Sequence, residues 1–225
     1  MHDITVIRRL NSPQQNERCE AMMEGLQAIG LNPVYNKGAN IPIKTKRVAI
    51  WGWRIGPELM KNHDVLVMEY GYIGDRKRYT SLGWNGLNGY ARFPEYPFDI
   101  KRFEALGGVI QPWKRGGQYA LILGQLANDA SLRGIDMNPL YQEWVKKLKL
   151  MDIPVFFRNH PEAVKHRKTY EIKGAPEIEG DLQTALKDAA FTVTFNSNSS
   201  VDSILAGVPC VTYDRGSMAY EMCVS

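Results

Sequence analysis

The sequence contains no apolar run that approaches the roughly 18 residues that a membrane-spanning helix needs. Residues 1–7 show no basic region followed by a long apolar stretch, so they are typical of a strand and not of an export signal. Of the 225 residues, 44% are apolar and 23% are charged, which suits a chain that buries a core. We therefore expect a cytoplasmic globular protein of one large domain or two small ones.

Cysteine is also scarce, and the common metal and phosphate motifs are missing. The three cysteines form no CxxC pair, and their odd number argues against a disulfide framework. Cys19 falls on a predicted helix and Cys210 on an apolar strand, where a free cysteine is typical of a small core residue. There is no GxxxxGK[ST] loop, no GxGxxG after a strand and no His/Cys cluster with metal-ligand spacing. The sequence thus predicts neither a metal nor a resident cofactor.

The formal net charge is only +4, so charge alone does not indicate nucleic-acid binding. Basic residues gather in segments 44–47, 76–78 and 165–168. These clusters would suit a phosphorylated or anionic partner, and a solvated surface explains them equally well.

Short β-rich runs alternate with helical patterns, which indicates parallel βαβ units and an α/β fold. In the helix predicted over 14–29, for example, apolar residues recur at spacings of three and four. The predicted strands are 4–7, 33–35, 47–51, 64–70, 119–125, 153–158, 191–195 and 209–213, and the other predicted helices are 57–61, 139–150, 181–189 and 201–206. The glycine-rich segment 71–117 breaks the rhythm and is either a functional loop or an irregular crossover.

We expect two Rossmann-like domains, over 1–135 and 136–225. The second is short at its C-terminus, because residues 219–224 are too few for the covering helix of an α/β layer. Either the chain is a minimal example of its class or another chain, such as a second copy, covers this edge.

Three polar segments follow predicted strands, where open α/β sheets bind ligands. Residues 196–200 (Asn-Ser-Asn-Ser-Ser) precede a helix, whose first N–H groups can hold a phosphate. Residues 158–161 (Arg-Asn-His-Pro) place His160 beyond a strand, where it could bind a phosphate or move a proton. Residues 124–131 carry Asp129, a candidate nucleophile or base. Plain helix capping, a structural histidine and an ordinary turn remain the alternatives for the three segments.

The order of these segments resembles bacterial capsule polysaccharide transferases, above all the Kdo transferases. The resemblance rests on Gly124-Gln125-x-x-x-Asp129-Ala130-Ser131, then Arg158-Asn159-His160-Pro161, then Ser199-Ser200 followed by the helix up to Pro209. Polysialyltransferases share the later two motifs. Asn159 stands where the family usually has a proline, and Asp202 replaces a glutamate of the helix motif.

The resemblance implies a GT-B glycosyltransferase, with an acceptor-side domain over 1–135 and a nucleotide-sugar domain over 136–225. It implies a CMP- or UDP-sugar as co-substrate, a hydroxyl acceptor such as a glycan, and no metal. The implied catalytic residues are Asp129 and His160. The donor-binding residues are Gln125, Arg158, His160, Ser197, Asn198, Ser199 and Ser200. On the acceptor side we expect Glu69, Asp75, Arg76 and Trp84.

Two alternatives stay open. The chain is short, which would suit a binding protein that keeps the nucleotide cleft without catalysis. The aromatic and basic residues around Arg76, Arg78, Trp84 and Arg92 would suit a nucleic-acid acceptor, so that the sugar would modify a DNA base.

Overall fold

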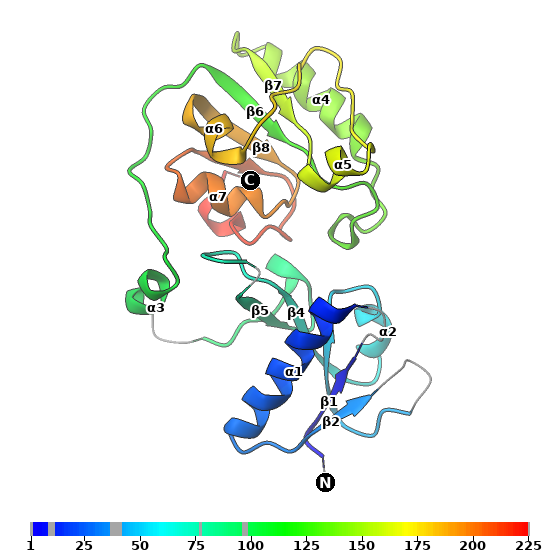
Figure 1. Ribbon diagram of the computed structural model, residues 1–225. Coiled ribbons are helices and arrows are strands. Elements are labelled where there is room, and N and C mark those ends of the chain that lie inside the picture. The colour runs from blue at the N-terminus through cyan, green and yellow to red at the C-terminus, as the bar shows by residue number, and fades with distance from the viewer. Residues whose placement is uncertain (1, 9–11, 37–41, 77, 96–98, 225) are drawn as a thin grey trace. The chain divides into compact units, whose positions relative to one another are not determined.

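The computed structural model describes residues 2–8, 12–36, 42–76, 78–95 and 99–224. The chain divides into two compact units, Met1–Gly107 and Gly108–Ser225, each built around its own sheet (Figure 1). Both sheets are dominated by parallel strands with helices in the crossovers, as in a Rossmann-like fold. The α/β prediction is therefore confirmed.

The first unit holds a sheet in the order β2-β1-β3-β4-β5. Its strands are β1 (Ile4–Ile7), β2 (Pro33–Asn36), β3 (Arg47–Trp51), β4 (Asp64–Tyr70) and β5 (Thr80–Trp84). Its helices are α1 (Pro13–Ala28), α2 (Gly56–Leu59) and α3 (Ile100–Ala105), with a 3₁₀ turn η1 (Asn88–Tyr90). The strands alternate their faces, so that Val6, Ala49 and Met68 pack with α1, and Val48 and Val67 face the side of α2.

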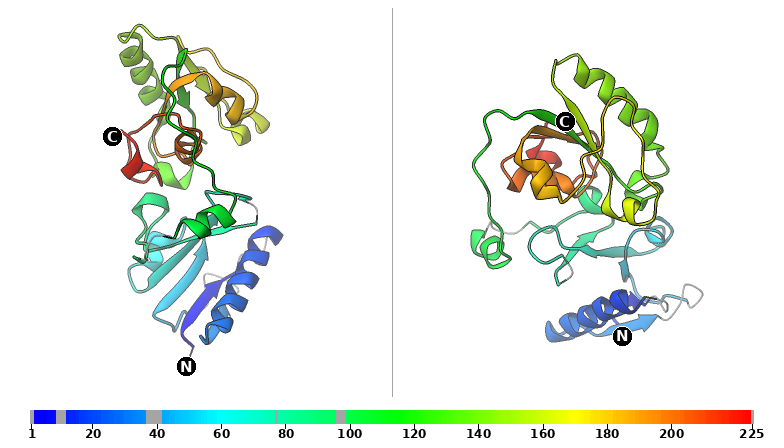
Figure 2. Two further views of the ribbon diagram at one scale, coloured as in Figure 1. Left: turned by 90° about the vertical axis from the view of Figure 1, so that its left-hand side faces the viewer. Right: turned by 45° about the horizontal axis from the view of Figure 1, so that its top comes forward.

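The second unit holds a fully parallel sheet in the order β7-β6-β8-β9. Its strands are β6 (Tyr119–Leu123), β7 (Val155–Arg158), β8 (Ala189–Thr194) and β9 (Cys210–Thr212). Its helices are α4 (Met137–Lys149), α5 (Pro161–Lys165), α6 (Leu182–Lys187) and α7 (Ser199–Leu205), with 3₁₀ turns η2 (Ala130–Leu132) and η3 (Tyr220–Met222). Helices α4 and α6 cover opposite faces of this sheet (Figure 2). Tyr141 and Trp144 of α4 are buried on one face, and Leu186 of α6 is buried on the other.

Two sequence-based expectations need correction. The units divide at Gly107, not at residue 135, because β6 pairs with β7 and β8 and so belongs to the second unit. The glycine-rich segment contains a regular strand, β5, which runs antiparallel to β4. At the far side of the second sheet, Val224 forms a parallel bridge with Val211, so the chain itself pairs with part of the outer edge of β9.

Candidate functional site

Polar segments that follow adjacent strands lie at one edge of the second sheet. The strands β7, β6 and β8 are neighbours and parallel, so their carboxyl ends share this edge. His160 follows β7, Asp129 follows β6 and Asn196 follows β8. The structure therefore brings together the three segments that the sequence singled out, at the edge where open α/β sheets bind ligands.

Both ends of the Gln125 side-chain amide form hydrogen bonds within the protein. Its Nε2 donates to Oδ1 of Asn196 at 2.7 Å, and its Oε1 accepts from the Asn196 backbone N–H at 3.0 Å. Its own backbone N–H donates to the Tyr141 hydroxyl at 2.9 Å. Gln125 is only 5% exposed. We predicted Gln125 to contact the donor; instead, its amide joins the loops after β6 and β8, because β6 and β8 are paired strands.

Asp214 and Arg133 extend this network, and the sequence had not marked either residue. One carboxylate oxygen of Asp214 accepts from Asn196 Nδ2 at 3.0 Å and from the Gly216 backbone N–H at 2.9 Å. The other pairs with the guanidinium of Arg133, which is 45% exposed. The sequence contained a signal for Asp214, because this residue closely follows β9, the last parallel strand of the sheet.

Most of the serine-rich segment is turned inward. Ser197 bonds the two residues that begin α7: its Oγ accepts from the Ser199 backbone N–H at 3.3 Å, and its carbonyl accepts from the Ser200 N–H at 3.0 Å. The Ser200 side chain is fully buried and shares a hydrogen bond of 2.8 Å with the Ser217 hydroxyl. The Val201 N–H donates to the Asn198 carbonyl at 3.0 Å. We expect an open helix start at Ser199 and Ser200, but the backbone N–H groups of both residues are bonded to Ser197, and only the Ser199 residue is not fully buried.

Asn198 lies at the N-cap position of α7 without a side-chain capping bond. Its Oδ1 is buried and has no hydrogen-bond partner among the residues that the structure describes. A buried polar atom without a partner is costly, at about 1–3 kcal/mol. Asn198 and Ser199 are therefore the members of this segment whose side chains suit contact with another molecule.

His160 is the N-cap residue of α5. Its Nδ1 accepts from the Glu162 backbone N–H at 3.2 Å, which requires that Nδ1 carries no proton. The neutral ring therefore carries its proton on Nε2, where it can be donated. Burial lowers the pKa of His160 below 6.5, and the nearby charge of Asp129 partly opposes this shift. Near neutral pH the ring is an uncharged donor.

Asp129 caps the short turn η2, with Oδ1 accepting from the Ser131 backbone N–H at 2.8 Å. The side chain is half-buried and lies close enough to His160 to influence its titration. A carboxylate and a neutral imidazole therefore face the same edge. Such a pair can take a proton from a hydroxyl group and donate one to a leaving group.

Arg158 and Asn159 both bond the backbone of segments beside His160. The Arg158 guanidinium donates from Nη2 to the Gly180 carbonyl at 2.9 Å, and burial lowers its pKa. Asn159 is 2% exposed, and its amide makes both possible bonds with the backbone of Tyr170, at 2.8 and 3.1 Å. Both residues fix the segments that flank His160.

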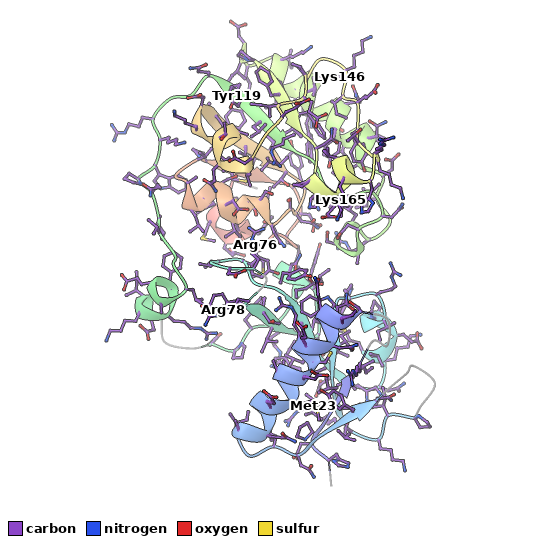
Figure 3. All side chains as sticks on the ribbon, in the orientation of Figure 1. Met23, Arg76, Arg78, Tyr119, Lys146 and Lys165 are labelled. Carbon is purple, nitrogen blue, oxygen red and sulfur yellow. The ribbon has the colours of Figure 1, made fainter. Side chains whose placement is uncertain are left out.

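The residues predicted for the acceptor side all lie in the first unit but do not form one group. Glu69 faces the turn after β3, since a Cβ added to Gly52 would lie 3.6 Å from its Oε1. Asp75 closes the turn that leads to β5, and Arg76 lies in that turn (Figure 3). Trp84 is at the opposite end of β5, where it pairs with Leu66 and packs in the α1 core. We therefore remove Trp84 from this set.

The arginines proposed as a nucleic-acid patch are divided in the same way. Arg76 and Arg78 precede β5, whereas Arg92 forms backbone bonds with Trp84 at its far end. Lys77 lies outside the described residues. The other basic side chains of the sequence clusters, such as Lys165 on α5, are exposed on the surface (Figure 3).

Within the described ranges, no group of three or more His, Cys, Asp or Glu side chains is placed to hold a metal ion. In the same part of the chain, no helix combines the length and apolar character needed to cross a bilayer.

No protein-family model matches the chain, and no curated protein matches it in sequence. Solved structures do match it. The β-Kdo 2,4-transferase of KpsC from Thermosulfurimonas dismutans superposes with a TM-score of 0.64 at 13% identity, covering 96% of this chain and 83% of that one. The β-Kdo 2,7-transferase of KpsC from the same organism gives a TM-score of 0.60 at 15% identity, with the same coverage of each chain. The chain therefore shares the fold of Kdo transferases, as the motif resemblance predicted.

Proposed function

We propose that this chain is a glycosyltransferase of the GT-B type, which moves a sugar from a CMP- or UDP-linked donor to a hydroxyl acceptor such as a glycan. The fold shared with the KpsC transferases supports glycosyl transfer in general. The polar segments at the carboxyl edge of the second sheet support placing the nucleotide at that edge. Neither a metal nor a cofactor has a role in the proposal.

The observation that carries the proposal is that Asp129 and His160 follow adjacent strands, β6 and β7, and that the charge of Asp129 influences the pKa of His160. His160 presents a neutral ring whose Nε2–H would bind the phosphate of the leaving nucleotide. Ser199 and Asn198 would add polar contacts from the neighbouring segment. A fixed donor of this kind stabilises negative charge as it develops. Asp129 would act on the acceptor hydroxyl or at the sugar carbon.

In this proposal the remaining residues have supporting roles. Gln125, Ser197, Ser200 and Arg158 hold the loops in place through the bonds described above. The first unit would bind the acceptor through Glu69, Asp75 and Arg76.

Titration calorimetry with CMP, UDP and their sugar conjugates tests the donor site. His160→Asn keeps a side chain that can accept the N-cap bond but removes the Nε2 donor. We expect it to weaken nucleotide binding by roughly 10- to 100-fold, because a hydrogen bond to a charged group contributes about 1.5–3 kcal/mol. His166→Asn is the matched control, since His166 ends the same helix and is exposed. Unchanged affinity of His160→Asn for every ligand that binds would place the donor elsewhere.

A further inference from the structure

Cys210 and Cys223 lie side by side at the outer edge of the second sheet. The Val224 backbone N–H donates to the Cys210 carbonyl at 3.0 Å, and the Thr212 N–H donates to the Val224 carbonyl at 2.9 Å. These bonds pair Val211 with Val224 in a parallel bridge. Cys210 directly precedes Val211, and Cys223 directly precedes Val224. Because side chains alternate along a strand, both cysteines point to the same face from adjacent strands.

The two thiols lie close enough for each to shift the pKa of the other, and their environments differ. Cys210 is 2% exposed, its Sγ donates to the Val211 carbonyl at 3.8 Å, and its pKa is raised by the neighbouring Cys223 thiol and by burial. Cys223 is partly exposed, and the neighbouring Cys210 thiol lowers its pKa. A thiolate is the attacking species in disulfide exchange. Cys223 is thus accessible and more readily ionised, with a second thiol on the adjacent strand to resolve a mixed disulfide.

We propose that Cys210 and Cys223 form a reversible intramolecular disulfide when the protein meets a low-molecular-weight disulfide such as oxidised glutathione. The Cys223 thiolate attacks one sulfur of glutathione disulfide and releases one glutathione thiolate. Cys210 then loses its proton and attacks the Cys223 sulfur of the mixed disulfide, which releases the second glutathione. The dithiol gives up two electrons and two protons in total, and one glutathione disulfide becomes two glutathione thiols.

The bond would close the loop over residues 211–222, which supports the candidate site. This loop carries Asp214, which bonds Asn196 and Arg133, and Ser217, which bonds the buried Ser200 hydroxyl. In the reduced protein the bridge at Val224 holds the end of the loop through backbone hydrogen bonds and no covalent link. Oxidation would fix this end covalently and restrict the opening of the loop. The disulfide does not depend on the proposed glycosyl transfer and can be tested without any nucleotide.

The test is incubation of the reduced, full-length protein with oxidised glutathione, followed by mass spectrometry without reduction. We expect the intact mass to fall by two hydrogens. Digestion should give a peptide pair that is linked through Cys210 and Cys223, while Cys19 stays a thiol. The thermal midpoint should rise by several degrees, since a cross-link restricts the unfolded chain. Dithiothreitol should reverse both changes.

Cys223→Ser and Cys19→Ser serve as matched variants. Cys223→Ser should abolish the mass loss and the thermal shift, whereas Cys19→Ser should keep both, because Cys19 is buried in the first unit. Cys223 is preferred to Cys210 for substitution because it is not fully buried. A stable glutathione adduct on Cys223 with Cys210 still free, or a disulfide between two copies of the chain, would overturn the proposal.

Discussion

Gln125 and Asn196 form a closed pair, in which the Gln125 amide bonds both the side chain and the backbone of Asn196, at 2.7 and 3.0 Å. Asn196 also donates to the Ser131 carbonyl at 3.0 Å and to Asp214. Loops after β6, β8 and β9 are thereby joined through one buried amide. A network in which every member is bonded holds a site in one geometry, and the loss of one member leaves others unpaired.

Gln125→Leu should therefore lower the free energy of unfolding by at least about 2 kcal/mol. Leucine fills a similar volume but leaves the Asn196 N–H and Oδ1 buried without partners, each at a cost of about 1–3 kcal/mol. Urea denaturation followed by tryptophan fluorescence measures the change. Gln183→Leu on the exposed face of α6 is the control and should change stability by less than about 0.5 kcal/mol. Equal effects of the two substitutions would contradict the proposed role of Gln125.

His160 should make the second unit less stable as the pH falls below 6.5. Its pKa in the folded protein is lowered, mainly by burial, so that below 6.5 the unfolded chain binds a proton more readily than the folded one. Its contribution to stability is complete above the unfolded pKa and declines as the pH falls toward the folded pKa. His160→Asn keeps a capping residue and should remove this part of the pH dependence.

Denaturation midpoints at about pH 7.5 and about pH 5.5 provide the measurement. The wild-type protein should lose more stability between them than His160→Asn does. His166→Asn should behave as the wild type. If His160→Asn instead loses as much stability between the two pH values as the wild type does, another group causes the acid sensitivity.

Much of the fold could be predicted from local pattern, whereas the use of each polar side chain could not. The apolar strands and the helix over 14–29 can be predicted from the sequence, because the spacing of apolar residues and the length of a run are properties of a single segment. The observed helix, α1, spans Pro13–Ala28. Polar residues after strands were expected to gather at one edge of the sheet, and the structure places them there, because parallel strands share their carboxyl edge. The inward direction of Ser200 follows from the buried face of α7, which also includes Val201 and Ile204.

The errors arose where strand pairing decides the outcome. The role of Gln125 depends on the pairing of β6 with β8, and the sequence does not state which strands are neighbours. The same uncertainty placed β6 in the wrong half of the chain. Trp84 and Glu69 are both expected on the acceptor side, but the antiparallel register of β4 and β5 places Trp84 opposite Leu66, away from the end where Glu69 lies.

Asp129→Asn distinguishes an enzyme from a binding protein. Asparagine can still accept the Ser131 N–H and so keeps the turn η2, but it cannot act as a base or nucleophile. Nucleotide release from the sugar donor should fall by about 10²-fold or more, while nucleotide affinity changes little. Asp136→Asn is the matched control, because Asp136 caps α4 in the same way, through the Asn138 N–H at 3.0 Å. Turnover that survives Asp129→Asn would remove Asp129 from the mechanism, and a wild-type protein that binds without turnover would be a non-catalytic binder.

Gly207, which follows α7, should tolerate no side chain. Its φ of +71° disfavours any residue with a Cβ, and an added Cβ would lie 2.1 Å from the Pro112 carbonyl oxygen. Relief of this clash requires residues 109–114 to move. Two backbone hydrogen bonds resist that movement: the Gln111 N–H donates to the Leu205 carbonyl at 2.9 Å, and the Lys114 N–H donates to the Gly207 carbonyl at 2.8 Å. Gly134 has a similar φ of +83° with nothing within 4 Å of an added Cβ, so it isolates the backbone strain. We expect Gly134→Ala to cost about 1–2 kcal/mol in chemical denaturation. Gly207→Ala should cost at least about 2 kcal/mol more, and equal costs would show that the 109–114 segment yields freely.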